Sequence, residues 1–165
     1  MRQIIEPQLE RYRNRLEERG IQLDFSLGGV PDQAIRMIVD VGLLSQVYAN
    51  LFSNAVKYTG KTTLPDGREG RFLSYGWKVI KDHFGKGKSG IHMWVFTSGD
   101  PLELDDPMTL FDPGYRADNT NHEHGTGHGL YFVRQVVELH RGDVGVKTCP
   151  YGNEINFTLP FQVQA

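Results

Sequence analysis

The spacing of apolar side chains divides the chain into helical and extended segments. Residues 3–19 and 41–58 repeat apolar positions every three or four residues, which predicts two amphipathic helices. Gly20 is placed to end the first helix, and Asp40 is placed to cap the second. The apolar run after a glycine-rich stretch predicts a third helix over 129–142, ending at Gly142.

The extended segments are shorter and more scattered. Short strands are expected at 21–26 and 35–41, and two longer runs, 71–84 and 90–96, are joined by GKGKSG as a β-hairpin. The last strands are expected at 143–148 and 154–161, around a turn at PYGN. Helices and strands do not alternate strictly. The pattern therefore favours an α/β two-layer sandwich, a mixed sheet with helices on one face, over a doubly wound sheet.

Residues 98–124 are predicted to form one long loop rich in Asp, Pro, Asn and His. Loops of this length without secondary structure are usually functional, for example as lids over a binding site. Aromatic side chains in the two central strands are expected to pack the sheet rather than stack on nucleic-acid bases; they are Tyr75, Trp77, Trp94 and Phe96.

Composition limits the class of protein. The 165 residues fit a single domain over 1–165, and because Met1 opens directly into a helical pattern, we expect a fragment of a longer chain. A net charge of −2 gives no electrostatic footprint for nucleic acid. No apolar run approaches the roughly 20 residues that span a bilayer, so no membrane contact is expected. The single Cys149 excludes an internal disulfide framework and fits a cytoplasmic location.

One face of the second helix carries an unusual set of polar side chains. At about 100° per residue, an arc of roughly 80° holds Gln46, Asn50, Asn54 and Lys57. The adjoining arc is apolar and predicted to be buried; it holds Leu44, Val47, Leu51 and Ala55. Asparagines are poor helix formers, so a pair one turn apart needs an explanation. Either they satisfy buried backbone groups, or their amide oxygens bind magnesium while the lysine contacts phosphate.

The stretch HGTGHGLYFV, residues 124–133, places three glycines directly before the third helix. Glycines permit close approach to the backbone, and a helix start presents unpaired N–H groups. Together they can bind an anion, often a phosphate. A simple glycine-rich turn before a helix is the alternative.

Taken together, these motifs resemble the ATP-binding catalytic domain of bacterial sensor histidine kinases. That family shares the Bergerat fold with gyrase B, MutL and the heat-shock chaperone ATPases. LLSQVYANLFSNAVKYT resembles its asparagine box, LFDPGYR its phenylalanine-containing box, GTGHGL its second glycine box, and YGNEINFTLPF its terminal strand. The order and spacing agree over roughly residues 1–162.

The resemblance implies a role for each matching residue. Asn54 would supply an amide oxygen to magnesium, and Asn50 would lie near the metal and the terminal phosphate. Lys57 would contact phosphate, Tyr58 would pack beside the adenosine, and Arg116 would reach the phosphates from the lid. The phosphate chain would be held by the second glycine box and the residue after it, namely Gly125, Thr126, Gly127, His128, Gly129 and Leu130.

The first glycine box departs from the pattern of the family. It should read Asp-x-Gly-x-Gly, but here it reads TSGDP, with Thr97 in place of the aspartate and Pro101 in place of the second glycine. Gly99 is retained. The family's aspartate accepts a hydrogen bond from the adenine amino group. Losing a charged acceptor weakens binding by roughly ten- to thirtyfold. His128 also stands where leucine is usual.

The implied function is to bind Mg-ATP and donate its terminal phosphate to a histidine. That histidine belongs to a separate dimerisation/phosphoacceptor domain of the same parent protein, which passes the signal to a response regulator. Without that domain the chain is not competent alone, and its parent is either free in the cytoplasm or anchored in the inner membrane.

Three other interpretations stay open. A degenerate fold could act as a regulatory protein-interaction module with weak or no nucleotide binding, as the altered TSGDP box would suggest. A stand-alone serine kinase of the anti-sigma type is a second. A metal site in the lid is a third, although solvated side chains fit better for its residues, His122, His124 and His128.

Overall fold

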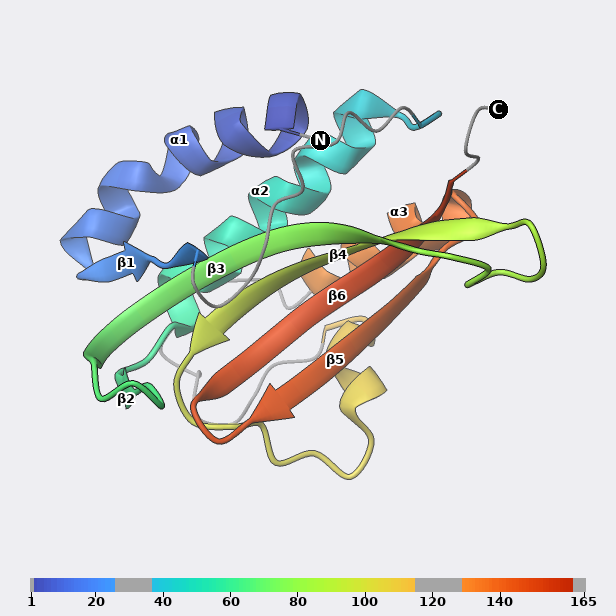
Figure 1. Ribbon diagram of the computed structural model, residues 1–165. Coiled ribbons are helices and arrows are strands. Elements are labelled where there is room, and N and C mark those ends of the chain that lie inside the picture. The colour runs from blue at the N-terminus through green and yellow to red at the C-terminus, as the bar shows by residue number, and fades with distance from the viewer. Residues whose placement is uncertain (1, 26–36, 115–128, 162–165) are drawn as a thin grey trace.

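The computed structural model describes residues 2–25, 37–114 and 129–161. It has two layers, a sheet and a set of helices that covers one face of it (Figure 1). The helices are α1 (Arg2–Glu18), α2 (Val41–Tyr58) and α3 (Gly129–Leu139), with a short 3-10 helix η2 (Pro107–Phe111). The strands are β1 (Ile21–Leu23), β2 (Thr62–Thr63), β3 (Glu69–Ile80), β4 (Ser89–Ser98), β5 (Asp143–Cys149) and β6 (Gly152–Phe161). The predicted two-layer fold is confirmed.

The sheet is mixed, as expected from the sequence. In the described part of the chain its order is β1-β3-β4-β6-β5, and β2 pairs with β3 outside this path. β1 runs parallel to β3, whereas the β3–β4, β4–β6 and β5–β6 pairs are antiparallel. The predicted hairpin is the β3–β4 pair, with a turn across residues 81–88.

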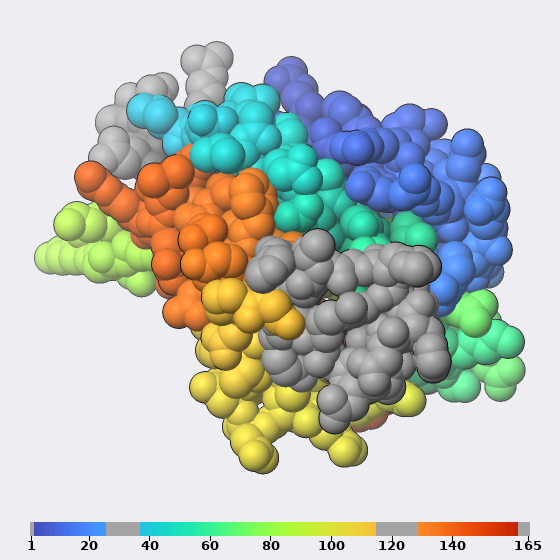
Figure 2. All heavy atoms as spheres, turned by 180° about the vertical axis from the view of Figure 1, so that it is seen from behind, coloured from blue at the N-terminus to red at the C-terminus, as the bar shows by residue number. Residues whose placement is uncertain are grey.

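The core lies between the sheet and the three helices. Alternate side chains of the central strands face the helices, and these belong to one buried cluster with the helices; they are Leu73, Tyr75 and Trp77 of β3 and Ile91, Met93 and Val95 of β4. Figure 2 shows the molecule from the helical side, where α1, α2 and α3 lie next to one another. The expected packing is confirmed for three of the four aromatic residues, because Tyr75, Trp77 and Phe96 are buried, whereas Trp94 is half-buried.

Helix α2 begins where the sequence predicts. The Asp40 carboxylate accepts a hydrogen bond from the Leu43 N–H at 2.9 Å, which satisfies one of the unpaired donors of the first turn. The predicted apolar stripe is buried throughout, in Leu44, Val47, Leu51 and Ala55. The amphipathic pattern therefore fixes which face of α2 is left for the polar side chains.

His140, directly after α3, joins that helix to the start of α2. Its Nε2 accepts a hydrogen bond from the Asp40 N–H at 3.0 Å, and its Nδ1 lies 2.8 Å from the Val136 carbonyl oxygen. A carbonyl oxygen can only accept, so Nδ1 is the ring nitrogen that donates to Val136. The end of α3 is thus fixed to the N-cap of α2.

One expectation about the connections was wrong, and two were confirmed only in part. The strand expected at 35–41 is absent from its described part, because residues 37–40 belong to no strand, Asp40 is the N-cap of α2 and Val41 begins that helix. The strand expected at 21–26 ends at Leu23, where Asp24 turns inward to an ion pair with Arg68 at 2.6 Å. The loop expected over 98–124 contains η2, capped by Asp106 with Pro107 in its first turn.

Candidate nucleotide-binding site

The polar face of α2 meets the first residue of α3. Asn50 donates from Nδ2 to the Gly129 carbonyl oxygen at 3.2 Å, across 79 positions of the sequence. A methyl group added at Gly129 would lie 4.0 Å from Asn50 Nδ2 and also 4.0 Å from Asn54 Oδ1. Both asparagines therefore flank the point at which the glycine-rich stretch becomes a helix.

The two asparagines differ in how their amides are used. The Asn50 Oδ1 accepts a hydrogen bond from Gln46 Nε2 at 2.8 Å, so both ends of that amide are engaged. The half-buried Asn54 amide makes no hydrogen bond to any residue that the structure describes. An amide oxygen without a protein partner suits a hard cation such as magnesium. Asn54 thus fits the predicted metal role, which stays a prediction.

Lys57 and Tyr58 occupy the last turn of α2. Lys57 is half-buried and forms no ion pair within residues 2–25, 37–114 and 129–161, so its ammonium group is open to a ligand. Tyr58 is 41% exposed, as a residue that packs against a bound base would be. The helix then ends at Thr59, whose hydroxyl donates to the Ala55 carbonyl oxygen at 2.5 Å.

The end of α2 is attached to the end of β4 through Ser98. The Gly60 N–H donates to the Ser98 carbonyl oxygen at 2.9 Å, and the Ser98 hydroxyl donates to the Gly60 carbonyl oxygen at 2.8 Å. The same hydroxyl accepts from the Phe72 N–H at 2.8 Å. Gly99 has φ +137, and a Cβ there would lie 3.3 Å from the Gly60 nitrogen. The positive φ of Gly99 and the tight contact that a Cβ would make with Gly60 both favour glycine at position 99.

Thr97 lies in β4 opposite Leu73 of β3 and Asn153 of β6. It has the same strand parity as Met93 and Val95, so its half-buried side chain is on the helical side of the sheet. The side chain of Thr97 therefore lies on the same face of the sheet as α2, and its role in holding the base stays a prediction.

Asn153 is a residue of this region that the sequence did not reveal. Its Oδ1 accepts from the Leu102 N–H and its Nδ2 donates to the Asp100 carbonyl oxygen, both at 2.9 Å. The Gly99 N–H also donates to the Tyr151 carbonyl oxygen at 3.0 Å. The altered TSGDP segment is thus fixed by hydrogen bonds to the turn and first residues of β6. Its place as the last residue of the predicted PYGN turn was the only signal.

Part of the predicted site lies outside the described residues. This applies to Arg116, Gly125, Thr126, Gly127 and His128, and to the lid histidines His122 and His124. Of the predicted phosphate cradle, Gly129 and Leu130 are described, and Leu130 packs against the core with its side chain partly buried.

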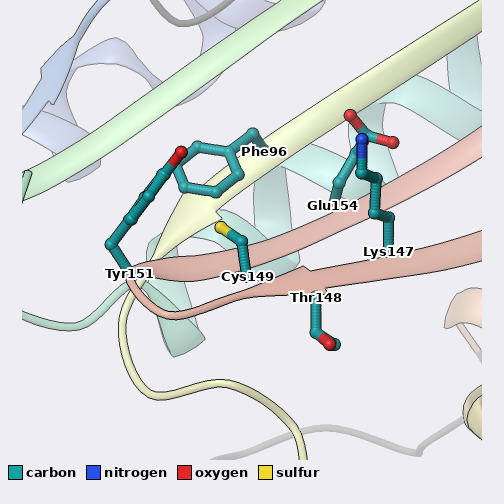
Figure 3. Close-up of a pocket in the computed structure, with 6 residues that line it drawn as sticks. All are labelled: Phe96, Lys147, Thr148, Cys149, Tyr151 and Glu154. Carbon is teal, nitrogen blue, oxygen red and sulfur yellow. The ribbon is translucent and has the colours of Figure 1, made fainter. Parts of the chain in front are cut away.

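A separate pocket of about 150 Å³ lies on the face of the sheet that the helices do not cover (Figure 3). It is lined by Phe96, Lys147, Thr148, Cys149, Tyr151 and Glu154. Side chains of successive strand residues point to opposite faces of a sheet, so Phe96 lies on the face opposite to Thr97. The Val146–Ile155 pair packs against the core, so the next pair, Lys147 and Glu154, faces away from it. This pocket is therefore unrelated to the asparagine face.

An asparagine-bearing helix set against a glycine-led helix, on one face of a mixed sheet, is the arrangement that the sequence predicted for an ATP-binding domain of the Bergerat type. Residues 39–163 match the family described as Histidine kinase-, DNA gyrase B-, and HSP90-like ATPase. The chain therefore belongs to this family of ATP-binding domains.

Several curated relatives are sensor kinases. The chain is 25% identical over 153 residues to the adaptive-response sensory kinase SasA of Crocosphaera subtropica, covering 92% of this chain and 36% of SasA. It is 30% identical over 146 residues to the sensor histidine kinase CusS of Escherichia coli, covering 87% of this chain and 26% of CusS. The chain therefore spans about a third or less of these relatives.

Solved structures share the fold. The mycobacterial sensor histidine kinase MprB has a TM-score of 0.71 at 22% identity, with 98% of this chain and 95% of that chain covered. The catalytic domain of the histidine kinase ThkA has a TM-score of 0.73 at 19% identity, covering 98% and 93%. Full-length ShkA in complex with AMPPNP has a TM-score of 0.75 at 23% identity, covering 98% and 30%.

No helix among the described residues has both the length and the apolar character needed to cross a membrane.

Proposed function

We propose that this domain binds Mg-ATP and donates the terminal phosphate to a histidine of a separate dimerisation/phosphoacceptor domain in the same parent protein. Nucleotide binding follows from the family. The observation that carries the site assignment is the meeting of Asn50 and Asn54 with Gly129, because it joins the asparagine helix to the end of the glycine-rich stretch.

The described residues suit distinct parts of the ligand. Asn54 has an amide oxygen available for magnesium, and Lys57 has an ammonium group available for phosphate. Tyr58 ends α2 directly after Lys57, and Thr97 lies near the end of β4; these two residues would hold the base. Arg116 and the backbone of the second glycine box complete the proposed phosphate site: Gly125, Thr126, Gly127, His128, Gly129 and Leu130.

The proposed reaction is an in-line phosphoryl transfer. The bond between the γ-phosphorus and the β–γ bridging oxygen breaks, a bond from that phosphorus to an imidazole nitrogen forms, and ADP leaves. The imidazole and the base that takes its proton belong to the acceptor domain. The residues of this chain contribute by positioning the phosphates and stabilising their charge, which is how most phosphoryl-transfer enzymes work.

The wider context is part of the same proposal. The relatives are longer than this chain, which supports a single catalytic domain at 1–165 within a multidomain sensor kinase. Its partners would be the phosphoacceptor domain and a response regulator, and its location the cytoplasmic side of the inner membrane or the cytoplasm. The nucleotide analogue bound by full-length ShkA supports ATP as the ligand.

The first experiment is a calorimetric titration of the domain with ATP and ADP, with and without magnesium. Micromolar to sub-millimolar binding that depends on magnesium is the expected result. A purified phosphoacceptor domain and γ-labelled ATP would then show transfer of the label. No binding at millimolar nucleotide would overturn the proposal in favour of the second candidate, a regulatory protein-interaction module, which the TSGDP box favours.

A further inference from the structure

Gln46 is not one of the residues assigned to the nucleotide, yet it contacts one of them. It lies on the exposed surface of α2, one turn before Asn50, and donates from Nε2 to Asn50 Oδ1 at 2.8 Å. Asn50 in turn donates from Nδ2 to the Gly129 carbonyl oxygen at 3.2 Å. The three groups form a chain of two hydrogen bonds, which we call the amide relay.

The direction of the amide relay is fixed by chemistry at one end. A carbonyl oxygen has no proton to donate, so Asn50 must turn its NH₂ group toward Gly129. Its Oδ1 then points away from Gly129, toward position 46. The residue at position 46 must therefore be a donor, and glutamine satisfies this requirement while glutamate does not.

From this geometry we infer that Gln46 is a positioning residue of the nucleotide site. By donating to Asn50 Oδ1, it holds the Asn50 NH₂ group on Gly129, and so fixes the first turn of α3 against α2. Asn54 is left as the amide with an available oxygen, one helical turn further along. The inference rests on the proposed function, since it assigns separate tasks to the two asparagines of the same site.

Three substitutions separate this role from simple packing. Gln46→Glu keeps the size but presents an acceptor, so Asn50 Oδ1 faces a carboxylate, or its amide turns over and Oδ1 faces the Gly129 carbonyl oxygen. Gln46→Ala removes the donor. Gln46→Lys changes the shape but restores a donor. All three lie on an exposed helix surface, where such residues are tolerated.

A matched control exists on α3. Gln135 is also exposed and donates from Nε2 to Tyr131 Oη at 2.8 Å, with the same four-residue spacing. Gln135→Glu makes the same chemical change away from the asparagine face. It should leave nucleotide affinity within twofold of wild type.

The first measurement is Mg-ATP affinity by calorimetry. We expect Gln46→Glu to weaken binding about tenfold and Gln46→Ala about threefold, with Gln46→Lys within twofold of wild type, because a misplaced or lost hydrogen bond changes affinity by such factors. Equal affinity in all four proteins would overturn the inference. So would a Lys variant as weak as the Glu variant, since then the shape of Gln46 and not its donor would matter.

The second measurement needs no nucleotide. The side-chain NH₂ resonances of Asn50, assigned through Asn50→Ala, should show one hydrogen-bonded proton in wild type and in Gln46→Lys. That proton should lose its bonded signature in Gln46→Glu. Unchanged Asn50 resonances in Gln46→Glu would overturn the amide relay even if ATP binds. A wild-type protein that binds no nucleotide but shows the bonded proton would instead reject the proposed function and leave the relay standing.

Discussion

The two ends of the candidate site are built differently. At the phosphate end, side chains of α2 reach toward α3, and one amide, that of Asn54, has no partner among the described residues. At the base end, the hydroxyl and backbone of Ser98 bind Gly60, and Asn153 binds the segment after β4. The phosphate end therefore has a polar side chain available to a ligand, whereas most polar groups described at the base end form hydrogen bonds within the protein.

This difference explains how the sequence can match the asparagine motif of α2 and yet depart from the family pattern at the TSGDP segment. The amides at the phosphate end must contact the ligand, so their identity is tied to its chemistry. The base end depends more on where the backbones of Gly60 and Gly99 lie, and those positions are set by Ser98. A change from aspartate to Thr97 can therefore weaken the contact to a base without disturbing the frame around it.

The largest expected effect tests the phosphate end. Asn54→Ala should reduce magnesium-dependent ATP affinity by roughly 100-fold or more, because it removes the amide oxygen available for the metal. Calorimetry with and without magnesium measures this. Asn156→Ala is the matched control, since Asn156 donates to Glu154 on the other face of the sheet. Unchanged affinity in Asn54→Ala, with an intact fold, would show that the metal is held elsewhere.

The next effect tests the frame of the base end. Ser98→Ala should lower the free energy of unfolding by about 2 kcal/mol, because a buried N–H of Phe72 and the Gly60 carbonyl oxygen lose their partner. Urea denaturation measures it. Ser74→Ala is the control on the same face of the sheet. Its buried hydroxyl has no partner in the described part of the chain, so its loss should cost nothing.

A smaller effect tests base recognition. Thr97→Asp should strengthen ATP binding by about tenfold, since a charged acceptor replaces a neutral hydroxyl at the end of β4. The comparison is made by calorimetry at pH 7, where an aspartate at the half-buried position is ionised. Equal or weaker affinity would mean that the base is held by groups other than residue 97.

The smallest effect returns to the phosphate end. Gly129→Ala has room for its methyl group between Asn50 and Asn54, at 4.0 Å from each. Alanine is the better helix former, so stability should rise by about 0.5 kcal/mol. The methyl group occupies the space that faces the ligand, and ATP affinity should fall a few-fold. A variant that is more stable and binds equally well would place the phosphates farther from α3.

The sequence predicted most of the frame because local signals were strong. Helix α2 had an amphipathic period and the Asp40 cap, and both are confirmed. The β3–β4 hairpin had two apolar runs around a glycine-rich turn. The 3-10 helix η2 was missed although Asp106 and Pro107 are a normal helix start, because the surrounding loop composition outweighed them.

The hydrogen bonds that connect distant parts of the site could not be predicted in the same way. The contact between Asn50 and Gly129 joins residues 79 positions apart, and no local pattern specifies which carbonyl an amide will meet. The same holds for Asn153 and the segment at 100–102, and for Ser98 and Gly60. Such contacts depend on how the helices and strands pack. The periodicity of the sequence predicts only which face of each element is buried, and not which residues meet there.

The attachment of α3 to α2 at both ends has a consequence for hydrogen exchange. Asn50 binds the carbonyl of the first residue of α3, and His140, just past its last residue, accepts from the N-cap of α2. Isolated helices fray from their termini, so their end amides exchange fastest. Here both termini are fixed to one neighbour, and the amide protons of α3 should therefore exchange together with those of α2, as one cooperative unit.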